Sequence, residues 1–175
     1  MELKIDRLVS PIGEILLVCD GEALAALDFI EAEARQARNL RRRQPSAELV
    51  PGPAPRFIRT RLEAYFAGEE ADLDAIPVKT GGTAFQERVW AALREIRFGQ
   101  TTSYGKLAAT LGMPTACRAV GMANGANPVS IVVPCHRVIG SDGTLTGYGG
   151  GIERKRWLLD HEGAAFVRPR LAAAE

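Results

Sequence analysis

The residues with the clearest chemical potential are a cysteine, a histidine and an arginine side by side at 135–137, directly after Pro134. The thiolate is the nucleophilic form of cysteine, and a neighbouring base or positive charge favours it. His136 and Arg137 can supply both, so Cys135 is the candidate nucleophile. The alternative, for Cys135 as for Cys19 and Cys117, is a buried inert cysteine, the commonest environment of this residue.

The segment before this triplet limits how the thiol and the imidazole can meet. The apolar run 129–133 predicts a buried strand that ends at Pro134. Consecutive residues of a strand point to opposite faces, so a water-mediated link between Cys135 and His136 is expected rather than direct contact. An imidazole base also needs an orienting partner, and Glu162 at the end of the last predicted helix is the candidate acid.

Metal and nucleotide chemistry find little support in the sequence. Only the adjacent pair Cys135 and His136 brings two such residues close in sequence, and neighbours cannot comfortably chelate one ion, so no metal is expected. The glycine cluster Gly147–Gly151 lacks the GxxxxGK[ST] order of a phosphate-binding loop. It is interpreted as a segment whose backbone passes close to a ligand.

Charge divides the chain into two parts. The 175 residues are 46% hydrophobic and 25% charged with a net charge of +1, which by itself argues against a nucleic-acid partner. Residues 1–80 carry 11 Lys and Arg against 14 Asp and Glu, a net charge of −3, whereas residues 81–175 carry 11 against 7, a net of +4. The asymmetry suggests two units, of which the second could meet a polyanion.

The cellular setting follows from what the sequence lacks. Its three cysteines form no CxxC pair, the N-terminus reads as a strand rather than a leader, and no apolar run approaches the roughly 20 residues of a membrane span. We therefore expect a cytoplasmic chain with no membrane partner.

The first 80 residues read as a small β-meander followed by helices. Strands are predicted at 3–9, 14–19 and 23–29, with an Asp20-Gly21 hairpin turn between the last two. A solvated helix is predicted at 31–43, a proline-rich loop at 45–55, a helix at 56–67 and an extended segment at 71–79. Gly81-Gly82 marks the boundary between the two units.

The second unit is mostly helical up to residue 127. One helix starts near Thr83, and two short helices, 103–111 and 115–124, are joined by the turn Gly112-Met113-Pro114. This is the pattern of a helix-turn-helix, although helix pairs with glycine turns are also common in proteins that bind no DNA. A final helix is predicted at 152–162. The fold class is thus α+β, with a β-sheet and helix domain at 1–80 and a winged helix-turn-helix-like domain at 81–175.

Taken together, the motifs resemble one known family, the O6-alkylguanine-DNA alkyltransferases. The resemblance covers roughly residues 57–163 in a fixed order, which is far more specific than a lone pattern. The motifs that carry it are Phe85-Gln86, Val89-Trp90, Thr102-Ser103-Tyr104-Gly105, Arg118-Ala119-Val120-Gly121, Asn127-Pro128, Val133-Pro134-Cys135-His136-Arg137-Val138-Ile139-Gly140, Gly147-Tyr148-Gly149-Gly150-Gly151 and Lys155-Arg156-Trp157-Leu158-Leu159-Asp160-His161-Glu162.

The resemblance implies a reaction that each molecule performs once. Cys135 would take an alkyl group such as methyl from O6 of guanine, with O4 of thymine as an alternative target, and keep it as a thioether. His136 would deprotonate Cys135 through a water, with Glu162 holding the imidazole. Asn127 would brace the active-site loop. No cofactor is implied, and the cysteine and histidine zinc ligands of some relatives are not evident.

The resemblance also implies double-stranded DNA containing O6-alkylguanine as the partner of a monomeric, cytoplasmic protein that meets the nucleoid when bound. The target nucleotide would be flipped out of the duplex. Tyr104 would help to rotate it and would donate a proton to the departing guanine, and Arg118 would fill the vacated space in the stack. The remaining DNA contacts would be Ser103, Ala119 and Asn124. The substrate pocket would be formed by Val138, Tyr148, Gly149, Gly150, Lys155 and Arg137.

Two alternatives belong to other classes of protein. A non-catalytic DNA binder, either a winged-helix regulator or an alkyltransferase-like lesion sensor, is disfavoured because such sensors lack the cysteine that stands at 135. A cysteine hydrolase using Cys135 and His136 is disfavoured because neighbouring strand residues face apart and no oxyanion hole is evident.

Overall fold

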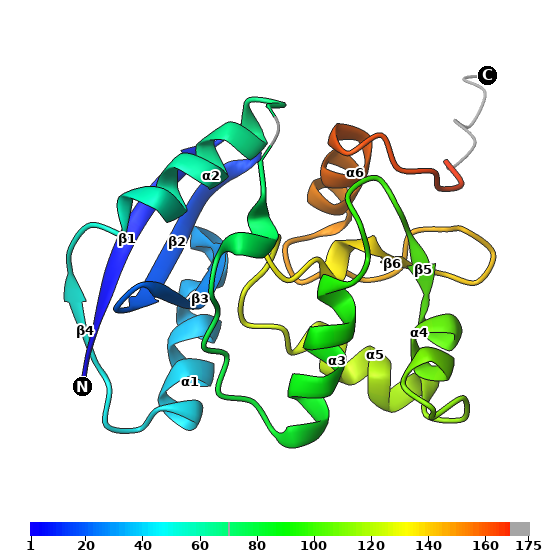
Figure 1. Cartoon of the computed structure of the whole chain (residues 1–175), viewed down its shortest axis with the longest axis horizontal. Coiled ribbons are helices and arrows are strands. Elements are labelled where there is room, and N and C mark those ends of the chain that lie inside the picture. Colours follow the sequence, from blue (N-terminus) through cyan, green and yellow to red (C-terminus); the bar gives the residue numbers. More distant parts are fainter. Residues whose placement is uncertain (70, 169–175) are drawn as a thin grey trace, which may run out of the picture.

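The computed structural model describes residues 1–69 and 71–168 and shows two units side by side (Figure 1). The expected C-terminal domain runs to residue 175, and 169–175 lie outside the described residues. The N-terminal unit contains β1 (Glu2–Ser10), β2 (Gly13–Asp20), β3 (Ala23–Phe29), η1 (Ile30–Ala32), α1 (Glu33–Arg43), β4 (Glu48–Pro51), α2 (Arg56–Phe66) and η2 (Leu73–Ala75). The C-terminal unit contains α3 (Ala84–Arg94), β5 (Thr102–Ser103), α4 (Tyr104–Thr110), α5 (Cys117–Gly125), η3 (Cys135–Arg137), β6 (Val138–Ile139) and α6 (Ile152–His161).

The three predicted strands are confirmed as β1, β2 and β3. Together with β4 they form a four-stranded sheet in the order β3-β2-β1-β4. The hairpin between β2 and β3 turns at Gly21, whose φ of 58° suits a residue without a Cβ. The segment predicted as a proline-rich loop also contains an edge strand, β4, which pairs in parallel with β1. Pro51 is tolerated there because β4 has a partner on one side only.

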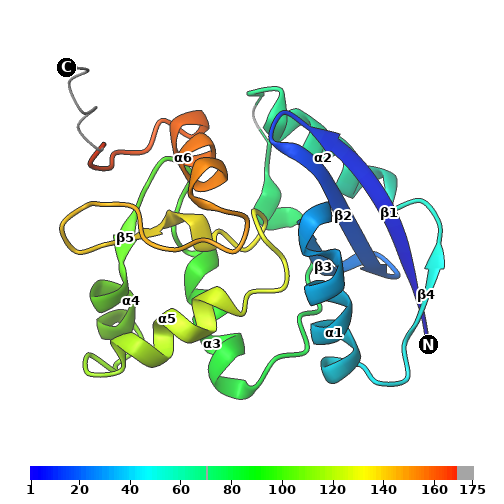
Figure 2. The ribbon, with the colours of Figure 1, turned by 180° about the vertical axis from the view of Figure 1, so that it is seen from behind.

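The sheet is covered on both faces. Ile15 and Leu17 belong to the cluster that also holds Ile58 and Leu62 of α2, whereas Val18 packs in a second cluster with Leu40 of α1. Because successive strand residues alternate between faces, burial on both sides explains why β2 and β3 are continuous apolar runs. The two helices appear on opposite sides of the sheet in Figures 1 and 2.

The outer edge of β3 connects the two units. Leu24 pairs with Val78 in the segment that leads to the C-terminal unit, and Leu27 pairs with Val129 of that unit. The Leu27 amide donates to the Pro128 carbonyl, and the Ser130 amide donates back to the Leu27 carbonyl, both at 2.9 Å. The segment expected to be extended at 71–79 instead starts with the 3-10 turn η2 before it reaches this edge.

The helices of the C-terminal unit are confirmed close to their predicted bounds. Thr83 caps α3 in a capping box with Gln86, and the Trp90 indole of α3 donates to the Ala123 carbonyl of α5 at 2.8 Å. Helices α4 and α5 pack against each other across the turn at 111–116, as a helix-turn-helix requires. Strands β5 and β6 form a small parallel sheet in the same unit.

The run 129–133 is not the buried strand that its apolar pattern predicts. Val129 and Ser130 make single bridges, and the chain then turns at Ile131, which has a φ of 73°. A β-branched residue in this region is strained. The turn is closed by the Val133 amide, which donates to the Val129 carbonyl at 2.9 Å. Cys135 consequently starts a 3-10 helix instead of following a strand.

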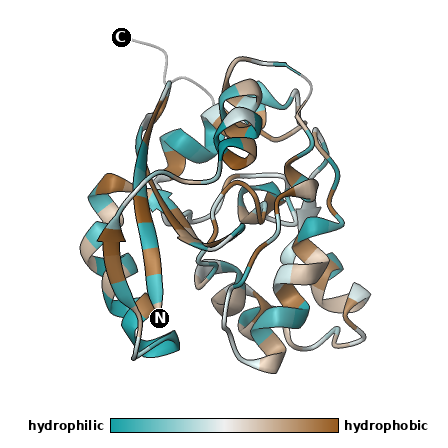
Figure 3. Ribbon diagram, turned by 60° about the vertical axis from the view of Figure 1, so that its left-hand side comes forward, coloured by the Kyte–Doolittle hydropathy of each residue, from teal (hydrophilic) through white to brown (hydrophobic). Residues whose placement is uncertain are grey.

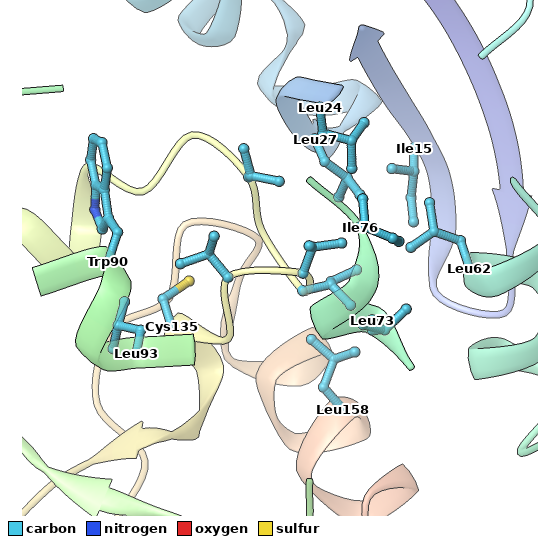
Figure 4. Packing of buried hydrophobic residues seen from close by; sticks show 14 of the residues in the cluster. Ile15, Leu24, Leu27, Leu62, Leu73, Ile76, Trp90, Leu93, Cys135 and Leu158 are labelled. Atoms are coloured by element: carbon cyan, nitrogen blue, oxygen red, sulfur yellow. The ribbon is translucent and has the colours of Figure 1, made fainter. Parts of the chain in front are cut away.

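One hydrophobic cluster runs through both units. Figure 4 shows residues of both units around the same core, all of them buried: Leu24 and Leu27 of the sheet, Leu73 and Ile76 of the segment after α2, and Leu158 of α6. Cys135 lies at the edge of this core beside Trp90 and Leu93. In Figure 3 the strands of the sheet carry long hydrophobic stretches, whereas the helices alternate between hydrophobic and hydrophilic residues. Within 1–69 and 71–168, no helix is both long and apolar enough to span a bilayer.

Candidate active site

Cys135 is held at the bottom of a small pocket. Its side chain lies in the first turn of η3, and the residue is 6% exposed. Asn127 braces the turn that precedes it, because its Nδ2 donates to the Val133 carbonyl at 2.8 Å and its Oδ1 accepts from the Val129 amide at 3.0 Å. These bonds fix the strained turn at Ile131 and hence the direction from which the thiol faces the pocket.

The pocket over the thiol has a volume of about 30 Å³. A cavity of this size holds a water molecule but is far too small for a flipped base. Arg35 and Gly149 line both this pocket and an outer cavity of about 310 Å³, so together they form the wall between the two. The full lining of the inner pocket is Asp28, Arg35, Asn124, Gly125, Asn127, Ser130, Cys135, Gly147, Tyr148 and Gly149.

Two of the lining residues come from the N-terminal unit and were missed from the sequence. Asp28 is a buried carboxylate in β3 that accepts from the Arg35 guanidinium at 2.9 Å. The same guanidinium nitrogen reaches the Gly149 carbonyl at 3.4 Å. A charged residue within an otherwise apolar strand is the signal that could have identified Asp28, since a buried charge requires a partner.

His136 and Glu162 lie in direct contact, as the sequence analysis expected. The imidazole Nε2 is 2.8 Å from Glu162 Oε1, and both side chains are completely buried. Within the described residues, the other ring nitrogen, Nδ1, is buried and has no hydrogen-bond partner. Since an ionised carboxylate only accepts, Nε2 carries the proton and Nδ1 has a free lone pair.

Arg137 lies elsewhere than the substrate pocket to which it was assigned. Its Nε donates to Glu162 Oε2 at 2.8 Å and its Nη2 to Glu162 Oε1 at 3.0 Å, which makes the pair bidentate. Its Nη1 donates to the Ile96 carbonyl. The 3-10 turn explains this placement, because it directs Arg137 behind His136 and away from the thiol.

A second residue of the N-terminal unit completes this buried group. The Tyr65 hydroxyl of α2 donates to Glu162 Oε1 at 2.8 Å. Tyr65 lies on the buried face of α2 with Ile58 and Leu62, and in the sequence a tyrosine on an apolar helix face cannot be told apart as a core aromatic or as a hydrogen-bond donor.

The electrostatics of the group keep the carboxylate ionised and the imidazole neutral. Burial raises the pKa of Glu162, but the hydrogen bonds that it accepts from His136 and Arg137 and the charge of Arg137 outweigh it and hold this pKa well below its usual range. Burial lowers the pKa of His136; Glu162 opposes that change, while the positive charges of Arg137 and Lys155 reinforce it. The balance leaves His136 as an uncharged base at neutral pH.

The resting thiol is protonated. Burial raises the pKa of Cys135, although the Asn127 side chain and the charge of Lys155 act in the opposite direction. Lys155 is itself completely buried, and its Nζ donates to the Val138 carbonyl at 2.6 Å and the Thr146 carbonyl at 3.2 Å. Burial lowers the pKa of Lys155 to about 8. Proton removal from the thiol therefore requires a base at the moment of reaction.

The helix-turn-helix exposes only some of the residues that the sequence assigned to DNA. Arg118 and Ala119 are exposed on α5, and Ser103 caps α4 by accepting from the Lys106 amide at 3.2 Å. The half-buried Tyr104 hydroxyl is 3.0 Å from Thr146 Oγ1. Asn124, assigned to DNA from the sequence, is instead 5% exposed and lines the inner pocket. It lies six residues beyond Arg118, and so on another side of the helix.

Met122 takes the outward position that Asn124 does not. It is 72% exposed and lies one helical turn after Arg118, so the two side chains share a face of α5. The sequence offers no signal for this, because the methionine also fits the apolar pattern of the helix.

Gly150 gives a direct test of how tightly the pocket wall is packed. A Cβ at this position would lie 2.6 Å from the Phe29 ring and 2.8 Å from the Tyr148 ring. We expect Gly150→Ala to lower the free energy of unfolding by about 1–3 kcal/mol through overpacking, as measured by urea denaturation. Gly147→Ala is the matched control, since a Cβ at that position would have nothing within 4 Å. Equal midpoints for the two variants would contradict the packing described.

In residues 1–69 and 71–168, no group of three or more His, Cys, Asp or Glu side chains is placed to hold a metal ion. The chemistry available at the site is thus that of one thiol, one neutral base held by a carboxylate, and a set of buried positive charges. This arrangement suits nucleophilic attack by sulfur, with the proton taken by the imidazole.

Comparison with known proteins places both units in one family. A family model described as "6-O-methylguanine DNA methyltransferase, ribonuclease-like domain" matches residues 7–80, and one described as "6-O-methylguanine DNA methyltransferase, DNA binding domain" matches residues 84–164. The methylated-DNA–protein-cysteine methyltransferase of Salmonella typhimurium is 49% identical over 166 residues, which cover 93% of this chain and 97% of that protein.

Solved structures agree along nearly the whole chain. The crystal structure of Mycobacterium tuberculosis OGT in complex with DNA is 44% identical, with a TM-score of 0.79 and a coverage of 93% of both chains. The O6-methylguanine-DNA methyltransferase of the hyperthermophilic archaeon Pyrococcus kodakaraensis is 26% identical with a TM-score of 0.75, covering 93% of this chain and 99% of that one.

Proposed function

The chain belongs to the 6-O-methylguanine DNA methyltransferase family, and we propose that Cys135 is the residue to which it transfers an alkyl group from O6 of guanine in DNA. The protein repairs DNA directly, by moving the alkyl group onto one of its own cysteines. Of its three free cysteines, only Cys135 lies in a pocket with an imidazole base beside it in the chain.

The reaction is a single displacement at an sp³ carbon. The sulfur of Cys135 forms a bond to the alkyl carbon as the bond from that carbon to guanine O6 breaks. The electron pair of the broken bond stays on guanine O6. His136 receives the thiol proton through a water at its free Nδ1. The Tyr104 hydroxyl donates a proton to the departing guanine and regains one from solvent, to which the His136 imidazolium releases the proton taken from the thiol. The product is a thioether, so each molecule acts once.

The observation that carries this assignment is the hydrogen-bond pattern of His136. Its Nε2 is engaged by Glu162 at 2.8 Å, which leaves the lone pair of Nδ1 as the proton acceptor. A 3-10 turn rotates successive residues by about 120°. Cys135 and His136 therefore share neither a strand face nor a direct bond, and a water between them is the simplest route for the proton.

The DNA contact is assigned to the exposed face of the helix-turn-helix. Arg118 and Ala119 on α5, with Ser103 and Tyr104 at the start of α4, face the duplex, and Arg118 fills the space left by the flipped nucleotide. The base then enters between Cys135 and the Tyr148–Gly150 segment. Because the closed pocket holds only about 30 Å³, this segment has to move outward.

The base is recognised through backbone groups. The carbonyls of Cys135 and Val138 accept from the guanine amine, and the Tyr148–Gly150 backbone closes over the ring. Lys155 donates to the Val138 carbonyl at 2.6 Å and so fixes its direction while leaving its second lone pair available. A single chain carries every group that this scheme uses, so we place the reaction in a monomer acting on DNA in the cytoplasm.

Mass mapping after reaction tests the proposal. The protein is incubated with a duplex containing O6-methylguanine, digested, and the three cysteine peptides are compared. We expect one added methyl group on the Cys135 peptide and none on those of Cys19 and Cys117, in a 1:1 ratio to repaired guanine. Folded protein whose Cys135 peptide stays unmodified while the lesion persists would contradict the assignment, and a second turnover by the same molecule would contradict the stoichiometry.

A further inference from the structure

Helix α2 of the N-terminal unit reaches into the centre of the catalytic group. Tyr65 lies in its last turn, is 1% exposed, and donates its hydroxyl proton to Glu162 Oε1 at 2.8 Å. This is the same oxygen that holds His136 Nε2, also at 2.8 Å. A residue of one unit thus shares an acceptor atom with the base of the other.

The carboxylate of Glu162 is saturated with donors. Oε1 accepts from Tyr65, from His136 and from Arg137 Nη2, and Oε2 accepts from Arg137 Nε. Each donor takes a share of the negative charge, so each weakens the pull of the carboxylate on the imidazole proton. The number and the direction of these donors therefore decide how strongly Glu162 favours a charged His136.

We propose that Tyr65 is a positioning residue for the alkyl transfer: its hydroxyl orients Glu162 and draws off part of its charge, so that His136 is held in place yet stays a neutral base. The proposal rests on the proposed function, because it concerns the same proton transfer. It gives the N-terminal unit a part in the chemistry besides support of the fold.

Packing alone does not account for the hydroxyl. The Tyr65 ring makes edge contacts with Phe66 at 5.3 Å, Phe98 at 6.2 Å and His161 at 5.1 Å, measured between ring centroids. The Tyr65 carbonyl binds His161 Nε2 at 2.5 Å. A phenylalanine would keep all of these contacts, and burying a hydroxyl is costly unless it is bonded. The ring of Tyr65 thus accounts for the packing, and the hydroxyl for the hydrogen bond to Glu162.

The charges around His136 determine the sign of the effect. Arg137 of η3 and Lys155 of α6 are positive and act against the imidazolium, Glu162 acts for it, and Tyr65 is neutral. The other titratable groups near these residues, Cys135, Tyr148 and His161, are unchanged by a substitution at 65. Removing the hydroxyl concentrates the charge of Glu162 on the remaining donors, which stabilises the imidazolium and raises the pKa of His136. Since neutral His136 is the active form, transfer should then require a higher pH.

The pH dependence of single-turnover transfer to O6-methylguanine DNA separates this role from a structural one. For Tyr65→Phe we expect transfer on the acidic limb of the rate profile to slow by about fivefold, the value of one ordinary hydrogen bond. The acidic limb of the rate profile should move to higher pH, and the affinity for DNA should stay unchanged. Site-specific 3-fluorotyrosine at 65 has a more acidic hydroxyl that donates more strongly, so it should move the same limb to lower pH in a protein that retains the native contacts.

Phe66→Leu is the matched control. Phe66 is the neighbouring residue of α2 and packs on Trp157 of α6 with ring centroids 6.0 Å apart. Its loss removes one edge contact of the Tyr65 ring and loosens the same interface, but it leaves the Tyr65 hydroxyl and its bond to Glu162 in the protein. It should lower stability and leave the acidic limb in place. The proposal is overturned if Tyr65→Phe and the fluorotyrosine protein both keep the wild-type profile, or if Phe66→Leu moves it equally. Failure of the proposed function would appear separately, as absence of methyl on Cys135 in the wild type.

Discussion

Replacing Cys135 by alanine is expected to abolish alkyl transfer completely while the protein still binds the damaged duplex. No other group in the described pocket is a nucleophile suited to an sp³ carbon, because the carboxylate of Asp28 is bound by Arg35 and the phenol of Tyr148 has a strongly raised pKa. The substitution removes one buried sulfur at the pocket, so stability should change by no more than about 1 kcal/mol. Loss of lesion measured by mass spectrometry of the DNA, together with a gel-shift titration, checks both parts.

The other two cysteines supply the controls for this result. Cys117 is exposed on α5, and Cys19 is buried in β2, where burial raises its pKa to about 11. Cys117→Ala and Cys19→Ala should each retain a full equivalent of transfer. Residual stoichiometric repair by Cys135→Ala, or loss of repair in either control with the fold intact, would show that the acceptor is another residue.

Replacing Glu162 by glutamine should have the second largest effect, on stability and on transfer together. The buried guanidinium of Arg137 would lose its charged partner, and breaking one side of a buried pair costs about 3–5 kcal/mol. The imidazole of His136 would face a neutral amide in place of the carboxylate that holds its tautomer and stabilises the imidazolium formed as the thiol loses its proton, so transfer should slow by about 100-fold or more. Thermal unfolding and single-turnover kinetics measure the two effects independently.

A second substitution distinguishes the structural loss from the chemical one. Combining Glu162→Gln with Arg137→Met removes both charges, and a neutral, well-packed replacement of a buried ion pair is often as stable as the original. We expect the double variant to regain most of the lost stability and almost none of the lost rate. Recovery of both together would mean that Glu162 serves only to neutralise Arg137.

The periodic parts of the structure could be predicted well from sequence. Strands β1 to β3 and helices α2 to α6 appear near their expected bounds, because their patterns were long or were flanked by clear turn residues such as Gly21. The contact between His136 and Glu162 was also expected. In contrast, the strand predicted at 129–133 was wrong, because the same apolar composition suits a strand and a buried turn. The left-handed backbone of Ile131 has no signature in the sequence.

The contributions of the N-terminal unit to the site could not be predicted, for a different reason. Arg35 lines the pocket of Cys135 and Tyr65 bonds Glu162, although both lie far from these residues in the chain. They meet because the two units dock along the edge of β3, where Leu27 pairs with Val129. Such a contact depends on how two units dock, which neither periodicity nor local motif encodes. Asn124 shows the same limit on a smaller scale, because its helix was predicted but the rotation of that helix against the pocket was not.

The confinement of Cys135 has a consequence for how long the protein remains useful. A sulfur that can accept only one group must not be lost to oxidants or stray electrophiles before it meets a lesion. Protonation, near-complete burial and a pocket of only about 30 Å³ over the thiol all slow such losses, and exposed Cys117 is easier for small reagents to reach. In the proposed reaction, the flipped base displaces the pocket wall and so exposes the thiol only where a lesion is present.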